Sequence, residues 1–338
     1  MGTQQTTMLQ ALNVALADAL AADPKVLVFG EDVADEEGGG VLGVTKGLSA
    51  KAGTERVRST PISEQAIIGA AIGAAMGGYR PVAEIMLMNF TAVAMDMIAN
   101  HAAKLRFMSG GQTRVPITIR MMTGAGLATG GQHADYWEAI FAHIAGLKVV
   151  APSTPADAYG LLRSCIDDPD PCIFIENLVS YSTKGEAAAP GTRVPLGKAR
   201  VAREGRDLTI VSYSRVALEA LQAADLLAAE GISAEVIDLR TISPWDREAV
   251  LRSGAKTGRL LSAHAAVRPF GAGAEIAATV SEELFGKLKA PVRRVGAPFC
   301  PVPFSSALES AFAVDRNDIV PIARSFMQST SEKVLELS

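Results

Sequence analysis

Continuous apolar runs of strand length alternate with longer segments of helical period along the whole chain. The runs at 26–30, 81–87, 115–121 and 172–176 contain several successive apolar residues rather than a strict apolar-polar alternation. Such runs are typical of strands that are buried on both faces of a sheet. The segment at 92–108 predicts a long helix between two of them. This order predicts an α/β fold with mostly parallel sheets and helices on both faces.

The pattern repeats in the second half of the chain, after a break. Residues 181–206 are rich in Gly, Pro, Ala and charged residues and show little periodicity. A length of 338 residues is enough for two domains. We expect two three-layer α/β domains at 1–185 and 207–338, joined by a linker at 186–206. The predicted strands of the second domain lie at 208–213, 234–239, 259–263 and 292–295.

One predicted helix carries an unusual glycine spacing. Gly69, Gly73 and Gly77 recur every four residues after Ser63 and Glu64. Glycine costs a helix interior about 0.5–1 kcal/mol relative to alanine, so a glycine face predicts close contact with another helix. Ser63 is expected to cap this helix, and Glu64 then lies in the first turn, where the helix dipole favours a negative charge.

Charge and cysteine content exclude several classes of protein. The 32 Lys and Arg residues against 36 Asp and Glu give a net charge of −4 without a dense basic stretch, so neither nucleic acid nor an anionic membrane is an expected partner. Cys165, Cys172 and Cys300 form no CxxC pair and are expected to be core residues in a reducing cytoplasm. The N-terminus lacks the pattern of a secretory signal, and the most apolar stretch, 66–78, is too short for a bilayer.

Glu64 and His133 are the two candidates for chemistry. From composition alone Glu64 reads more readily as a solvated carboxylate at a helix start. Its apolar neighbours Ile62, Ile67 and Ile68 favour instead a buried acid with a raised pKa, which suits proton transfer. A histidine in a glycine-rich loop is likewise more often structural than catalytic.

Several motifs together resemble one family. The glutamate-plus-glycine helix is similar to that of thiamine-diphosphate enzymes, and further segments resemble the β subunit of the decarboxylase component of 2-oxoacid dehydrogenases. These segments cover nearly the whole chain, at 60–64, 80–86, 108–112, 131–133, 146–150, 240–242 and 271–276. The resemblance implies a transketolase-like pyrimidine-binding domain followed by a transketolase C-terminal domain.

The resemblance also implies roles for individual residues. The glutamate matching Glu64 hydrogen-bonds a ring nitrogen of the cofactor's aminopyrimidine and favours the imino form that deprotonates the thiazolium carbon. Met86 and Phe90 match positions that pack around the pyrimidine, and Ile62 is expected to lie near it. The histidine matching His133 is implicated in proton handling or in transfer to the lipoyl group, a task suited to imidazole.

Metal ions and partners follow from the same resemblance. Mitochondrial relatives hold a potassium ion largely through carbonyl oxygens, although Asp167-Asp168 here could simply form an exposed turn between a helix and a strand. The matching positions are Ile117, Cys165, Ile166, Asp168 and Asp170. The chain has no Gly-Asp-Gly motif with a downstream Asn for magnesium and diphosphate. A separate α subunit is therefore expected to hold both in an α2β2 heterotetramer, with the glycine helix at the interface and a lipoyl acyltransferase core as a further partner.

Departures from the family pattern leave the substrate open. Ala134 and Asp135 stand where relatives commonly carry Ser-Gln, Ser59 replaces a frequent aspartate, and His264 lies where a glutamate is usual, as a replacement at the domain rim or a surface residue. Pyruvate is the first expected substrate, followed by acetoin and branched-chain 2-oxoacids. A two-chain transketolase that moves a ketol unit, and a non-catalytic subunit that docks an acyltransferase core, are the alternatives.

Overall fold

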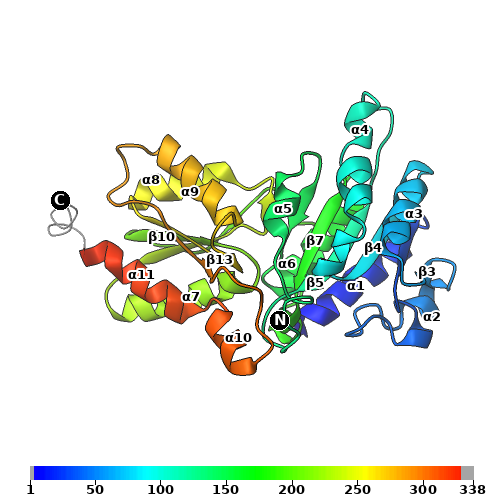
Figure 1. Ribbon diagram of the computed structural model, residues 1–338, viewed down its shortest axis with the longest axis horizontal. Coiled ribbons are helices and arrows are strands. Elements are labelled where there is room, and N and C mark those ends of the chain that lie inside the picture. Colours follow the sequence, from blue (N-terminus) through cyan, green and yellow to red (C-terminus); the bar gives the residue numbers. More distant parts are fainter. Residues whose placement is uncertain (1–3, 329–338) are drawn as a thin grey trace.

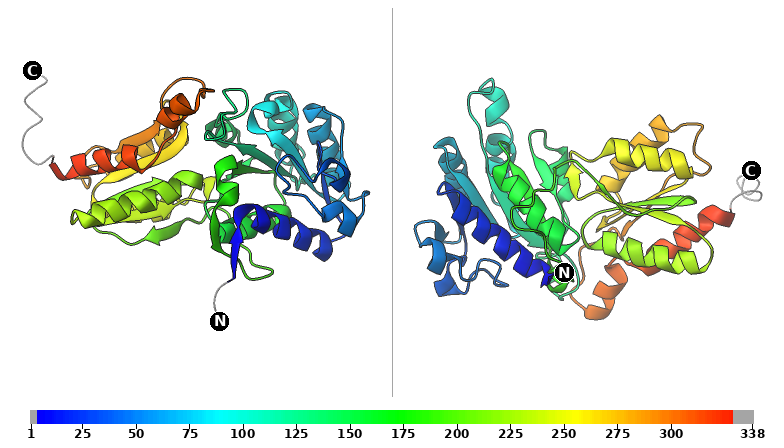
Figure 2. Two further views of the ribbon diagram at one scale, coloured as in Figure 1. Left: turned by 90° about the horizontal axis from the view of Figure 1, so that it is seen from below. Right: turned by 180° about the vertical axis from the view of Figure 1, so that it is seen from behind.

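The computed structural model describes residues 4–328, which form two lobes side by side (Figure 1). The N-terminal half forms one lobe and most of the C-terminal half forms the other. In each lobe helices cover both faces of a mostly parallel sheet, as the two further views also show (Figure 2). The predicted pair of three-layer α/β units is confirmed.

The first lobe contains a seven-stranded sheet in the order β12-β6-β7-β5-β4-β2-β3. Six of its strands are parallel, and the edge strand β12 pairs antiparallel with β6 although it comes from the C-terminal half. The four runs predicted as strands in this half are confirmed to within a few residues. The strands are β2 (Val26–Gly30), β3 (Val57–Ser59), β4 (Arg80–Leu87), β5 (Thr118–Thr123), β6 (Lys148–Val150), β7 (Cys172–Asn177) and β12 (Thr241–Ser243).

Neighbouring residues of one strand face opposite helical layers. Val82 of β4 belongs to the core beneath α1 (Met8–Ala22) and α6 (Pro155–Asp167), whereas Ala83 belongs to the core beneath α3 (Glu64–Met76). This alternation explains the continuous apolar runs. Further elements of the lobe are β1 (Gln5–Thr7), η1 (Asp35–Glu37), α2 (Leu48–Ala52), α5 (Glu138–His143), η4 (Leu178–Ser182) and β8 (Lys184–Glu186), and β1 pairs with β8.

The long helix predicted at 92–108 is wrong in detail. The segment divides into the end of the 3-10 turn η2 (Met88–Ala92), the π-helical turn η3 (Met97–Ala102) and α4 (Leu105–Met108). The wider turn is closed by the Ala103 N–H, which donates to the Ile98 carbonyl at 3.1 Å, and both residues are buried. The insertion of a π turn therefore keeps residues five apart on the core side.

The second lobe contains a five-stranded sheet in the order β14-β13-β10-β11-β9, with β9 (Arg200–Arg203) antiparallel at one edge. The helices α7 and α11 cover one face, and α8 and α9 cover the other (Figure 1). The remaining strands are β10 (Leu208–Ser212), β11 (Ala234–Asp238), β13 (Leu260–Val267) and β14 (Arg293–Ala297). The helices are α7 (Ser214–Ala229), α8 (Arg247–Thr257), α9 (Ala272–Glu283), α10 (Ser306–Phe312) and α11 (Arg316–Gln328).

The segment expected to be a linker, 186–206, thus supplies the strand β9 to the second sheet. The division at 185 and 207 stays a prediction, and its ends at 1–3 and 329–338 lie outside the described residues. Within residues 4–328 no helix has the length and apolarity needed to cross a bilayer. Cys165 and Cys172 are buried as predicted, whereas Cys300 lies in an exposed loop after β14, so its prediction as a core residue is wrong.

Candidate active site

The candidate catalytic residues gather at the carboxyl ends of the parallel strands in the seven-stranded sheet. Glu31 follows β2 directly, and Glu64 begins α3, which follows β3. In α/β sheets this edge is where ligands usually bind. Glu64 is 9% exposed. Ser63 occupies the N-cap position of α3, but its side chain makes no capping hydrogen bond, so the predicted cap is wrong; its backbone is far from the usual N-cap conformation, with ψ of 75°.

Four carboxyl groups, those of Glu31, Asp32, Glu64 and Glu84, interact electrostatically at the carboxyl ends of these strands. Glu31 is buried, and its Oε1 has no hydrogen-bond partner in the part of the chain that the structure describes. Burial raises the pKa of Glu31, and the charges of Glu64, Asp32 and Glu84 raise it further. Because burial and nearby negative charges both disfavour a charged carboxylate, Glu31 holds a proton more readily than an ordinary glutamate.

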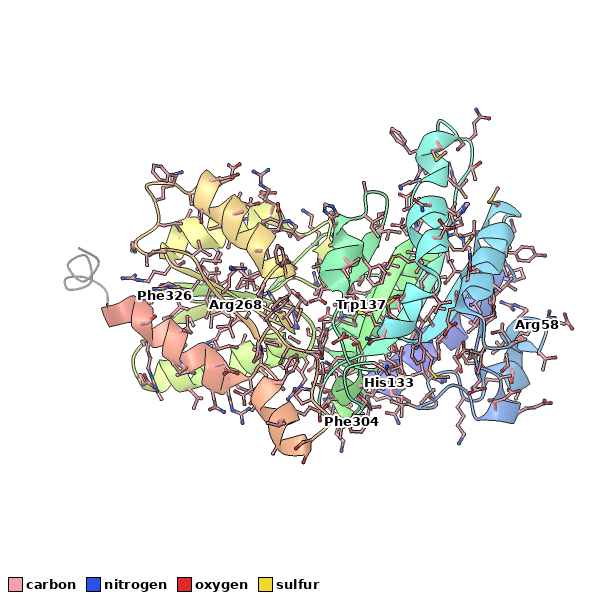
Figure 3. The ribbon with its side chains drawn as sticks, in the orientation of Figure 1. Arg58, His133, Trp137, Arg268, Phe304 and Phe326 are labelled. Carbon is pink, nitrogen blue, oxygen red and sulfur yellow. The ribbon has the colours of Figure 1, made fainter. Side chains whose placement is uncertain are left out.

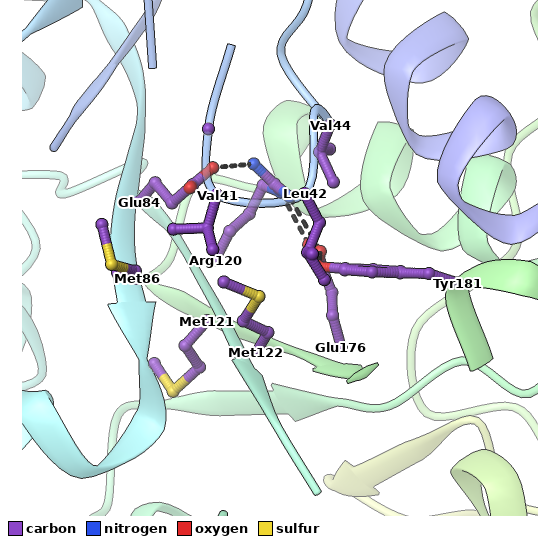
Figure 4. A pocket seen from close by; sticks show the side chains of 11 residues that line it. Val41, Leu42, Val44, Glu84, Met86, Arg120, Met121, Met122, Glu176 and Tyr181 are labelled. Atoms are coloured by element: carbon purple, nitrogen blue, oxygen red, sulfur yellow. Dashed lines mark hydrogen bonds and ion pairs between the residues drawn. The ribbon is translucent and has the colours of Figure 1, made fainter. Parts of the chain in front are cut away.

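A buried arginine joins three strands beside these acids (Figure 4). Arg120 of β5 donates from Nη1 to Glu84 of β4 at 2.6 Å. Its Nε and Nη2 donate to the two carboxylate oxygens of Glu176 in β7, at 2.6 and 2.8 Å. Tyr181 also donates to Glu176. Burial raises the pKa of Glu84 although Arg120 opposes the shift.

Sequence reasoning assigned no role to Arg120 or Glu176. The sequence did contain one signal for these residues. The apolar runs at 115–121 and 172–176, which predict buried strands, each contain one of these two charged residues. A charge in such a strand must be paired, since an unpaired one costs several kcal/mol. Two opposite charges in neighbouring buried strands therefore predict an ion pair, and the sheet pairing supplies it.

The charged network forms one wall of a small pocket whose other walls are apolar (Figure 4). Met86, a predicted cofactor contact, lines this pocket together with Val41 and Leu42 from a glycine-rich loop. Gly40 of that loop has φ of 82°, and a Cβ atom there would lie 3.3 Å from Glu84 Oε1. Glycine is thus required both for the turn and for the close approach to the carboxylate.

His133 and Phe90 form a second part of the site. Their ring centroids lie 5.5 Å apart, edge to face, with an interplanar angle of 72°. The loop before His133 touches the second lobe, since Phe304 packs against Gly130, and both His133 and Phe304 lie near the junction of the lobes (Figure 3). From α10, Glu309 accepts hydrogen bonds from the backbone of Gly126 at 2.7 Å and Ala128 at 2.9 Å.

Ile62 differs from the other predicted contacts. Its side chain is 83% exposed, next to the start of α3.

The glycine face of α3 is also open: a Cβ atom on Gly73 would meet nothing within 4 Å, and one on Gly69 would meet only Met97 Sδ, at 3.7 Å. The close helix contact predicted for this face is therefore not made within the described chain, which leaves the face available to a partner.

The residues predicted to hold potassium lie near the amino-terminal ends of the strands β5 and β7, away from the candidate catalytic residues. Their oxygens there have protein partners. The carbonyl of Ile117 accepts from the Cys172 N–H at 2.9 Å, and that of Ile166 accepts from Arg80 at 3.0 Å. The carbonyl of Cys165 accepts from the Asp168 N–H at 3.2 Å. Lys148 Nζ lies 2.5 and 2.6 Å from the carboxylate oxygens of Asp168, and Arg106 pairs with Asp170. The potassium site stays a prediction.

His264 is neither a rim residue nor a surface residue, contrary to expectation. It is fully buried in the second lobe, stacks on Tyr213 at a centroid distance of 6.2 Å, and bonds the Ala266 carbonyl through Nδ1 at 3.1 Å. A Cβ atom on Gly271, Gly273 or Gly296 would come within 3 Å of its ring. The imidazole therefore fills space that these glycines leave.

Comparison with known proteins identifies both lobes. The transketolase pyrimidine-binding domain matches residues 4–182, and the transketolase C-terminal domain matches residues 197–319. The β subunit of the acetoin:2,6-dichlorophenolindophenol oxidoreductase of Cupriavidus necator is 44% identical, over 94% of this chain and 96% of the relative. The β subunit of the pyruvate dehydrogenase E1 component of Bacillus subtilis is 43% identical, over 96% and 99%. The chain belongs to this family of dehydrogenase β subunits.

A solved structure described as a split gene transketolase, an inactive β4 tetramer, has the same fold. Its TM-score is 0.78 at 24% identity, over 97% of this chain and 99% of that one. The family uses thiamine diphosphate, and the residues at the strand ends suit its pyrimidine half. Within residues 4–328, a buried carboxylate oxygen of Glu31 has no hydrogen-bond partner, and Glu31 interacts with Glu64 and Glu84. Glu84 lines a pocket together with the half-buried Met86. Polar acceptors next to an apolar wall match a flat aminopyrimidine.

Proposed function

We propose that this chain is the β subunit of a 2-oxoacid dehydrogenase that decarboxylates pyruvate and passes the acetyl group to a lipoyl domain, acting only with an α subunit. The observation that carries the proposal is the position of Glu64. Glu64 is a buried residue at the carboxyl ends of the parallel strands, within the electrostatic reach of Glu31. It begins a helix whose glycine face is left open by residues 4–328.

Each residue of the site has a task in this proposal. Thiamine diphosphate supplies the electron sink for decarboxylation when it is bound. Glu64 exchanges a proton with the pyrimidine, and Glu31, whose pKa is raised by burial and by the charge of Glu64, lies within electrostatic reach of it. Met86 and Phe90 form apolar walls that exclude water. His133 handles the proton during transfer to the lipoyl group, at the junction of the two lobes.

The partner supplies the other half of the site. In the proposal an α subunit binds magnesium and the diphosphate, and the open glycine face of α3 packs against it in an α2β2 heterotetramer. The subunit names of the relatives support a second chain. A lipoyl acyltransferase core is the acceptor, potassium is an optional structural ion, and the cytoplasm is the expected compartment.

The test is turnover by the assembled pair. The chain is co-expressed with a candidate α subunit, and dye reduction is measured with thiamine diphosphate and magnesium for pyruvate, acetoin, branched-chain 2-oxoacids and a ketose phosphate. Glu64→Gln should lower kcat for the accepted substrate by about 10²–10⁴-fold while assembly persists. Glu55→Gln is the matched control, because Glu55 is an exposed carboxylate on the same lobe. Equal activity of wild type and Glu64→Gln would contradict the proposal.

Acetoin is the second candidate substrate, because a β subunit named for acetoin is as similar to the chain as those named for pyruvate. Turnover of acetoin alone would favour it, and turnover of branched 2-oxoacids would favour the third candidate. Transfer of a ketol unit from the ketose phosphate would identify a two-chain transketolase. Assembly without turnover of any substrate would favour a non-catalytic subunit that docks an acyltransferase core.

A further inference from the structure

The turn that carries His133 is held at both ends by one side chain. Asn89 lies in η2, directly before Phe90, and its Nδ2 donates to the Gly131 carbonyl at 3.1 Å and to Asp135 Oδ2 at 2.9 Å. In return, the Asp135 N–H donates to Asn89 Oδ1 at 3.2 Å. We propose that Asn89 and Asp135 form a clamp that positions His133 for the reaction, which rests on the proposed role of His133.

Only an amide can make this set of contacts. Nδ2 uses both of its hydrogens and Oδ1 accepts at the same time, so every polar group of Asn89 is engaged with the turn. An aspartate of the same shape has no N–H donors and would set a second carboxylate against Asp135. The geometry thus specifies asparagine rather than a polar residue of any kind.

The clamp also fixes the ring beside it. Phe90 follows Asn89 in the chain and meets the His133 ring edge to face at 5.5 Å. One segment therefore binds the ends of the turn through Asn89 and the middle of it through Phe90. Inside the turn the His133 N–H donates to the Gly130 carbonyl at 3.1 Å, and Thr123 Oγ1 donates to the Asp135 carbonyl. The position of the imidazole is thereby tied to the end of β4.

The clamp gives a role to Asp135. Its half-buried carboxyl is the acceptor that meets Asn89. Burial raises the pKa of Asp135, and the hydrogen bond from Asn89 opposes this shift. The same partner that holds the turn also stabilises the ionised carboxylate.

A double-mutant cycle on the assembled α and β subunits tests the clamp. Asn89→Asp, His133→Ala and the double variant are compared by kcat for acylation of a free lipoyl domain and by KM for pyruvate, or for the 2-oxoacid that the assembly accepts. Asn89→Asp should lower kcat at least tenfold with KM changed less than twofold, and should lower it no further in the His133→Ala background. Asn100→Asp, which alters an exposed Asn–Asp pair at 2.8 Å, should leave kcat unchanged.

Each remaining outcome is decisive. If Asn89→Asp lowers kcat by the same factor with and without His133, or does not lower kcat at all, the clamp is refuted while the proposed function stands. If His133→Ala leaves kcat unchanged, the proposed role of His133 fails and the clamp fails with it. Should Asn89→Asp prevent assembly, Asp135→Ala removes one acceptor without adding a charge and is measured in the same cycle.

Discussion

His264 is a titratable ring enclosed by the second lobe. Burial lowers its pKa to about 4, although the Ala266 carbonyl opposes the shift. An unfolded chain binds a proton near the usual value of 6.5, so the unfolded state takes up the proton first as the pH falls. The free energy of unfolding should therefore decrease between about pH 6.5 and pH 4, by up to about 3 kcal/mol from this residue.

Urea unfolding at several pH values measures this contribution. His264→Asn keeps a donor for Ala266 but cannot titrate, so the difference in unfolding free energy from wild type should shrink as the pH falls through this window. His101→Asn is the control, because His101 is nearly half exposed. Parallel curves for wild type and His264→Asn would show that the ring is not kept neutral by burial.

Single residues were singled out only where a motif surrounded them. Glu64 was proposed from its place before three spaced glycines and from the family resemblance, and His133 from the resemblance alone, since its glycine-rich loop favours a structural role; both roles stay predictions. Arg120 and Asn89 were missed because their partners, Glu176 and Asp135, are 56 and 46 residues away in the chain. Spacing along a sequence cannot report a contact that the pairing of β4, β5 and β7 creates.

At the scale of elements, α3 has one face packed and one face open. Ile68 and Ala71 are fully buried against the sheet, whereas Gly73 is exposed and has free space around its Cα. Gly73→Leu should leave the unfolding free energy of this chain equal or higher, since glycine disfavours a helix by about 1 kcal/mol. The same leucine should block close approach of a partner helix and weaken α–β association at least tenfold, or about 1.4 kcal/mol.

Calorimetry or analytical ultracentrifugation of the α and β subunits measures whether Gly73→Leu weakens their association. Ala228→Leu is the matched control, a small-to-large change at an exposed position of α7. Unchanged affinity in Gly73→Leu would exclude the glycine face from the interface.

Strands were easier to predict than helices in this chain. A strand buried on both faces needs only a short apolar run, so 26–30 is predicted to the residue. The helix at 92–108 is interrupted by a π turn, in which the backbone of the buried Ala103 bonds that of the buried Ile98, five residues earlier. The edge strands β9 and β12 were missed because they are short and partly polar, and only their sheet neighbours stabilise them.

At the scale of the whole molecule, the two lobes share a strand and a hydrophobic core. The strand β12 lies in the first sheet although it follows β11 of the second, and the core beneath α3 continues to Ile276 of α9. Glu309 extends this coupling to the site, because its carboxylate holds the loop that leads to His133. The second lobe is thus a support for the catalytic loop as well as a separate α/β unit.

Replacing Glu309 should loosen that loop without unfolding either lobe. In Glu309→Gln one oxygen still accepts, but the amide nitrogen would face the N–H of Gly126 or Ala128 and leave it unsatisfied, at a cost of about 1–3 kcal/mol. Hydrogen exchange should therefore accelerate at least tenfold in residues 124–135 and stay unchanged in α7. Glu283→Gln, which removes a half-exposed carboxylate paired with Arg247, should alter neither segment. Equal exchange of the loop in wild type and Glu309→Gln would show that the lobes are held together elsewhere and that the loop keeps its shape unaided.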